Sequence, residues 1–118
     1  MTTDLMGATK PEVAVYWALT RLGEDFEFQS QTLGQRGEKG SALSDFLLRQ
    51  YSLIISVIGF YWHNRPETKA RDKLQRIVLS SMGLHVIYID ELDALKNPTY
   101  YVQQAILGRD HSRYKELV

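Results

Sequence analysis

The chain has 118 residues, 14 basic and 14 acidic side chains, and no cysteine. The length fits one domain, residues 1–118, with its own core. The lack of cysteine excludes disulfides, iron–sulfur clusters, thiol catalysis and a cysteine-bound structural zinc. A net charge of zero excludes a protein that holds nucleic acid by bulk charge alone. No stretch approaches the roughly 20 apolar residues that span a bilayer, so we expect a cytoplasmic protein without a membrane partner.

The first predicted helix runs from about residue 10 to residue 22, after a loose leader over 1–8. Thr9 and Glu12 stand at the N-cap and N3 positions of a capping box. Gly23 then provides a stop signal. Glu12 is therefore either a capping residue or an acid available to a site, and the sequence leaves both interpretations open.

Three strands are predicted next. Residues 26–29 alternate apolar and polar side chains, and 42–49 form a second strand after a loop over 33–41 that contains three glycines. Residues 53–58 are apolar or β-branched on both faces, except for one serine. This pattern is typical of a central strand covered on both sides.

The second long helix is predicted to begin at Pro66 and to end at Gly83. Its apolar residues form one stripe, as in an amphipathic helix: Ala70, Leu74, Ile77, Val78 and Met82. Five basic residues cluster between positions 65 and 76: Arg65, Lys69, Arg71, Lys73 and Arg76. The cluster is either a solvated helix face or a set of phosphate contacts.

The chain then continues with a strand over 85–89, an acidic turn over 90–93 and a helix over about 99–107. Residues 109–118 are expected to be frayed or loosely docked. The order α-β-β-β-α-β-α predicts an α/β domain with a mixed four-stranded sheet flanked by helices on both faces.

The run from Gly59 to His63 follows the predicted central strand directly. This run is accompanied by Glu12 in the first predicted helix, by the pair Asp45-Phe46 in the second strand and by the pair Arg71-Asp72 in the next helix. In this order the residues resemble the very-short-patch mismatch repair branch of the restriction-endonuclease-like nucleases, over roughly residues 9–93. The resemblance implies a restriction-endonuclease-like core, DNA as partner and a role in DNA repair.

Carried over position by position, the resemblance implies a site for Mg²⁺. Asp45 would be the metal-binding carboxylate, and the backbone carbonyl of Val57 would complete the metal shell. His63 would lie near the scissile phosphate, oriented by Asp72, and Glu12 would support a metal-bound water. A hard cation binds oxygen ligands and keeps several waters, and a histidine held by an acid can move a proton, so the chemistry is coherent.

The resemblance also implies contacts with DNA. Tyr61 and Trp62 would match aromatic residues that wedge into the base stack. Basic residues near and within the second long helix would contact phosphates: Arg65, Lys69, Lys73 and Arg76.

Two functions remain open at this point, beside a third option, a housekeeping α/β domain with no site. The first is a Mg²⁺-dependent DNA endonuclease or nickase. The second is a non-catalytic module with the nuclease fold, which binds nucleic acid, forms a homo-oligomer or joins a larger assembly such as a phage particle. The second is motivated by Ile58, which stands where the branch carries a histidine, and by Ser56 and apolar residues where the wider superfamily carries an acid and a lysine.

Overall fold

The computed structural model describes residues 8–30, 44–59 and 66–113. In chain order the elements are α1 (Lys10–Arg21), β1 (Glu27–Ser30), β2 (Ser44–Leu48), the 3₁₀ turn η2 (Arg49–Tyr51), β3 (Leu53–Ile58), α4 (Pro66–Ser81), β4 (His85–Asp90), α5 (Glu91–Lys96) and α6 (Pro98–Ile106).

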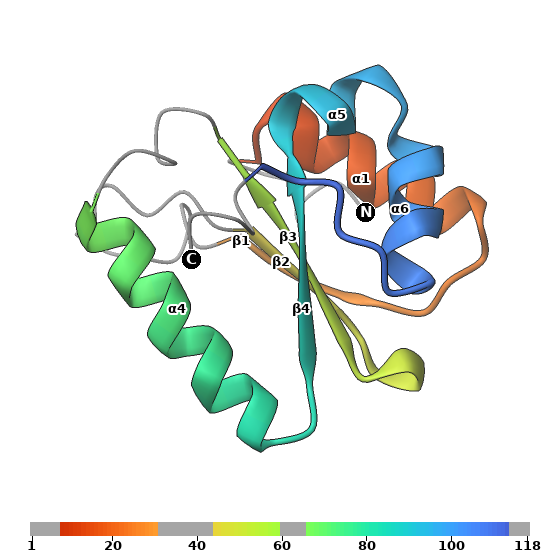
Figure 1. Cartoon of the computed structure of the whole chain (residues 1–118). Helices are drawn as coiled ribbons and strands as arrows, with labels where there is room; N and C mark the ends of the chain where they lie inside the picture. The colour runs from red at the N-terminus through yellow and green to blue at the C-terminus, as the bar shows by residue number, and fades with distance from the viewer. Residues whose placement is uncertain (1–7, 31–43, 60–65, 114–118) are drawn as a thin grey trace.

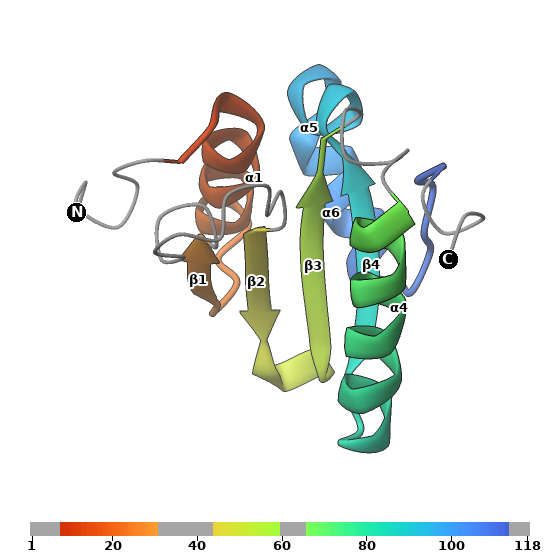
Figure 2. The same cartoon turned by 90° about the vertical axis from the view of Figure 1, so that its left-hand side faces the viewer.

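The four strands form one mixed sheet in the order β1-β2-β3-β4. The pairs β1/β2 and β2/β3 are antiparallel, and β3/β4 is parallel. Helices α1, α5 and α6 cover one face of the sheet, while α4, the connection between β3 and β4, lies on the other face (Figures 1 and 2). The predicted α/β class and the mixed sheet flanked by helices are therefore confirmed.

Strand β3 occupies the centre of this arrangement, and all six of its residues are buried. Alternate residues point to opposite faces of a strand. Leu53, Ile55 and Val57 belong to the main core, which also holds Phe46 of β2 and Val102 of α6. The prediction of a central strand over 53–58 is confirmed, with both of its boundaries correct.

The capping box at the start of α1 is present as predicted. The backbone N–H of Thr9 donates to Oε1 of Glu12 at 2.9 Å. Glu12 is 4% exposed and shares a helix face with Val15, Ala18 and Leu19, which pack into the core. The helix therefore presents its first acid toward the sheet and not toward solvent.

Helix α4 differs from the expected amphipathic packing. Its apolar stripe is exposed, with 63% of Leu74, 58% of Ile77, 51% of Val78 and 67% of Met82 accessible. Among the described elements α4 packs mainly on β4. There the guanidinium carbon of Arg76 lies 5.8 Å from the centroid of the Tyr88 ring. The apolar stripe thus faces away from the sheet that it was expected to cover.

One prediction for the C-terminal part is wrong. Residues 91–93 are not a turn but the first turn of α5, which follows an N-cap at Asp90. Residues 109–113, expected to be frayed or loosely docked, are held against β4. Oδ2 of Asp110 accepts a hydrogen bond from the Tyr88 N–H at 3.0 Å, and Oδ2 of Asp90 accepts one from the Arg113 N–H at 3.1 Å. Residues 114–118 and 1–7 lie outside the described residues.

The segment 109–113 is further ordered within itself. Oδ1 of Asp110 accepts hydrogen bonds from the backbone N–H of Ser112 at 2.9 Å and from its hydroxyl at 2.6 Å. Ser112 is 3% exposed. The segment covers part of the outer edge of β4, which would otherwise present unpaired backbone groups.

Within the described part of the chain, no helix combines the length and the apolar character that crossing a membrane requires.

We predict that Asp110→Ala lowers the free energy of unfolding by about 2 kcal/mol, because it removes hydrogen bonds made by a charged acceptor. Arg109→Ala, which changes an exposed neighbour, should stay close to wild type. Chemical denaturation monitored by circular dichroism measures both. Equal stability of the two variants would show that the segment does not hold β4.

Candidate functional site

The predicted site elements meet at one end of the sheet. Figure 2 shows the first turn of α1, the start of β2, the carboxyl ends of β3 and β4 and the N-terminal end of α4 all at this end. Ligands in α/β proteins commonly bind beyond the carboxyl ends of parallel strands. A ligand-binding or catalytic site is therefore expected at this end of the sheet.

A row of residues crosses the sheet on the face toward α4. Asp45 of β2 pairs with Ser56 of β3, which pairs with Tyr88 of β4. The row lies on this face because the next residues along the strands, Phe46 and Ile55, point into the main core on the other face. The structure describes the backbone of Asp45 but not its side chain.

Strand β3 supplies no acid or base to this face. The residues that point there are Ile54, Ser56 and Ile58, which are 7%, 2% and 0% exposed. The nearest carboxylate on β4 is Asp90, which pairs with Ile58 at the strand's end. Asp90 was not among the predicted site residues. It could have been found only from the parallel register of β3 and β4, which the sequence does not show.

Helix α4 brings Asp72 to the same region. Asp72 precedes Arg76 by one turn, and residues four apart share a helix face. Arg76 lies over Tyr88, so helix periodicity places position 72, one turn earlier, on the sheet-facing side of α4. The structure thereby brings the backbones of Asp45 and Asp72 to one face and one end of the sheet.

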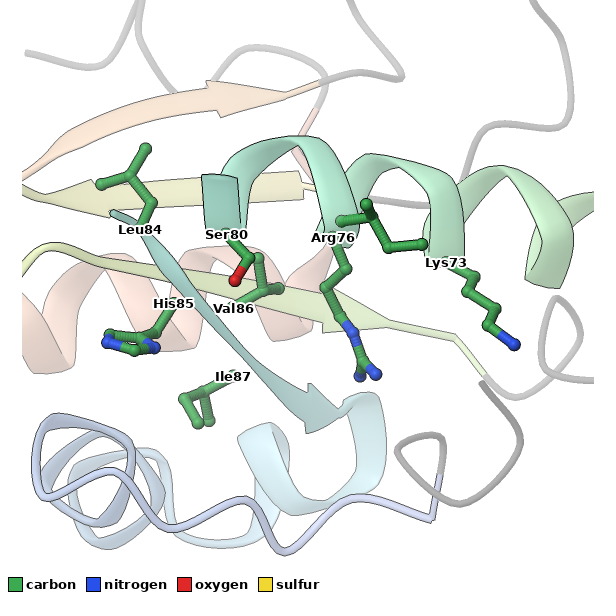
Figure 3. A pocket seen from close by; sticks show the side chains of 8 residues that line it. Lys73, Arg76, Ser80, Leu84, His85, Val86 and Ile87 are labelled. Carbon is green, nitrogen blue, oxygen red and sulfur yellow. The ribbon is translucent and has the colours of Figure 1, made fainter. Parts of the chain in front are cut away.

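An open groove of about 450 Å³ lies between α4 and β4. Its polar lining consists of Lys73, Arg76 and Ser80 from α4 and His85 from β4. Figure 3 shows Lys73 and Arg76 extending from neighbouring turns of α4, with His85 at the opposite end of the groove. Two cations spaced along an open groove suit successive phosphates of a nucleic-acid strand.

Glu12 reaches the same end of the sheet from the opposite face. It lies in the first turn of α1, on the side that faces the sheet. Its Oε1 accepts the Thr9 N–H, so the capping role is shown. The predicted role with a metal-bound water stays a prediction.

Arg49 lies at the end of β2 remote from Asp45 and binds Glu27 of β1. Its Nε and Nη2 donate to the Glu27 carboxylate at 2.8 and 3.3 Å. This hydrogen bond, together with the opposite charge, lowers the pKa of Glu27 and raises the pKa of Arg49. Both side chains are more than half exposed, so the pair adds little stability.

Several predicted site residues fall outside the described part of the chain. These are His63, Tyr61, Trp62 and Arg65, and the same holds for the side chains of Lys69, Asp45 and Asp72. In the ranges 8–30, 44–59 and 66–113, no three histidine or acidic side chains are grouped as metal ligands would be.

The two residues predicted to bind Mg²⁺ stand close together in the register of the sheet. Asp45 pairs with Ser56, and Ser44 pairs with Val57, so the carboxylate and the backbone carbonyl belong to neighbouring positions of adjacent strands. Both donors are oxygens, which a hard cation prefers.

No protein-family model, curated protein or solved structure matches this chain. The geometry at the end of the sheet is therefore the main support for a function.

We predict that Glu12→Gln leaves the free energy of unfolding nearly unchanged, because glutamine also serves in a capping box. Glu12→Ala should lower it by about 1 kcal/mol. Thermal and chemical denaturation measure both. If Glu12→Gln destabilises as much as Glu12→Ala, the buried carboxylate does more in the fold than cap the helix.

Proposed function

We propose that the protein is a Mg²⁺-dependent DNA endonuclease or nickase of the restriction-endonuclease-like type. One observation carries the proposal: β2, which carries Asp45, begins at the end of the sheet where the central strand β3 stops and α4, which carries Asp72, begins. The mixed four-stranded sheet flanked by helices is compatible with this proposal. Such a site would serve DNA repair or phage DNA processing.

In this proposal Asp45 and the carbonyl of Val57 hold the cation. A bound Mg²⁺ would polarise the scissile phosphate and lower the pKa of a bound water. Asp72 orients His63, which transfers a proton to or from a reacting oxygen. Glu12 holds water from the opposite side of the sheet end.

The groove between α4 and β4 would hold the DNA backbone. Lys73 and Arg76 lie on consecutive turns of the helix that carries Asp72, so phosphate contacts along α4 lead toward the proposed catalytic end. Tyr61 and Trp62 would contact unstacked bases there.

We predict that Asp45→Asn reduces Mg²⁺-dependent nicking of supercoiled plasmid by at least about 100-fold, the scale seen when a group that stabilises a transition state is lost. Asp25→Asn, which changes an exposed acid before β1, is the matched control and should retain activity. Equal nicking by wild type and Asp45→Asn would refute the nuclease proposal, provided that both variants fold as the wild type does.

A specific observation favours the second candidate, a nuclease-fold module that binds nucleic acid without cleaving it. The sheet face toward α4 receives only Ile54, Ser56 and Ile58 from the central strand, all buried. A strand without acid, lysine or histidine contributes nothing to proton transfer. The groove would remain able to bind a phosphate backbone.

Lys73→Ala should weaken DNA binding about uniformly across sequences and reduce the slope of log K against log[salt] by about 1. Lys96→Ala, which removes an exposed cation at the end of α5, should leave the slope unchanged. Fluorescence anisotropy at several salt concentrations measures both. Salt-dependent binding without nicking supports the second candidate, and an unchanged slope in Lys73→Ala argues against the groove.

A further inference from the structure

The contact between Arg76 and Tyr88 lies beside the groove that we assign to the DNA backbone. The guanidinium carbon of Arg76 is 5.8 Å from the centroid of the Tyr88 ring, within the range of a cation–π contact. Tyr88 is 3% exposed, whereas Arg76 is half-buried and lines the groove. We propose that Tyr88 is a positioning residue, which holds the Arg76 guanidinium ready to bind one phosphate of the nucleic-acid strand. This role rests on the proposed use of the groove.

The shape of the guanidinium group allows both contacts at once. A cation–π contact uses the face of the planar group, while its N–H donors lie in the plane and point outward from the edge. A phosphate can therefore accept two hydrogen bonds from the edge while the ring lies against the face. Figure 3 shows the Arg76 side chain extending from α4 across the groove toward β4.

The described carboxylates do not occupy the donors of Arg76. Among the described side chains, no carboxylate forms an ion pair with this arginine. Asp90 follows Tyr88 by two residues on β4, and its Oδ2 accepts the backbone N–H of Arg113 at 3.1 Å. Asp72 stands one turn before Arg76 on α4, and its side chain lies outside the described part of the chain. A phosphate in the groove would supply an acceptor for the guanidinium.

The backbone of Tyr88 is held from both sides of its strand. Tyr88 pairs with Ser56 of β3 on one side, and on the other its N–H donates to Oδ2 of Asp110 at 3.0 Å. A ring fixed in this way restricts Arg76 before any ligand arrives. The arginine then loses less conformational entropy on binding, which is the usual gain from preorganisation.

Fluorescence anisotropy with a labelled DNA duplex in the absence of Mg²⁺ tests the proposal without any need for cleavage. Tyr88→Leu should weaken binding by about 5-fold, the scale of a cation–π contact, and Tyr88→Phe, which keeps the ring, should retain the affinity. In an Arg76→Ala background Tyr88→Leu should have no further effect, because the two residues act as one unit. Tyr16→Leu is the matched control, since it removes a half-buried tyrosine of α1 on the opposite face of the sheet.

Salt dependence separates positioning from direct contact. Arg76→Ala should reduce the slope of log K against log[salt] by about 1, whereas Tyr88→Leu should leave the slope unchanged because the cation stays in the groove. Circular dichroism checks that each variant folds.

An exchange at position 76 tests the same idea with the buried ring in place. Arg76→Lys keeps the charge but lacks the planar edge of donors, so it should also weaken binding by about 5-fold, in line with the loss of the stacked arrangement. Arg109→Lys, the same exchange at an exposed arginine after α6, should leave binding unchanged. The proposal is therefore open to refutation even if Tyr88→Leu does not fold.

Three results would overturn the proposal: full affinity in Tyr88→Leu, an additive loss in the double variant, or full affinity in Arg76→Lys. A wild-type chain that binds no DNA would refute the proposed function together with this role. A chain that binds DNA through Arg76 but tolerates Tyr88→Leu would refute the positioning role alone. A chain that shows the expected coupling but does not nick DNA would support the positioning role and refute the endonuclease alone.

Discussion

The burial of β3 on both faces is the constraint from which the rest of the architecture follows. Six consecutive buried residues require a layer on each side of the sheet. Helices α1, α5 and α6 supply one layer. The parallel pairing of β3 with β4 supplies the other, because a parallel pair needs a crossover, and here the crossover is α4. The same connection returns the chain from the carboxyl end of β3, so α4 begins near that end of the sheet.

The sequence predicts the elements whose signals are local. The apolar run over 53–58 and the capping box of Thr9 and Glu12 depend on neighbours in the chain, and both were located correctly. The start of α5 was missed because acids after a strand were interpreted as a turn, although acids also favour the first turn of a helix. The periodicity of α4 shows which of its residues are apolar. It does not show on which side the sheet lies, and for this reason the exposure of Leu74 was not foreseen.

In the candidate site, too, the residue types could be predicted from the sequence, but their arrangement in space could not. Asp45 and Asp72 could be singled out one at a time, but their common face depends on the register of β2 with β3 and on the path of α4. Tyr88 and Asp90 enter the region only through the parallel register of β3 and β4. Pairing between distant strands leaves no mark within either strand, so these neighbours could not be predicted from the sequence.

The attachment of α4 has a consequence for the energetics of the molecule. Parts of a protein with few buried apolar contacts open at a lower free energy than its core. With its apolar stripe outside and β4 as its main support, α4 should exchange its amide hydrogens faster than β3. A ligand that binds α4 only when the helix is formed and packed on β4 then stabilises that state against local opening, by mass action. A nucleic-acid strand bound in the groove would thus stabilise the helix that carries Lys73 and Arg76.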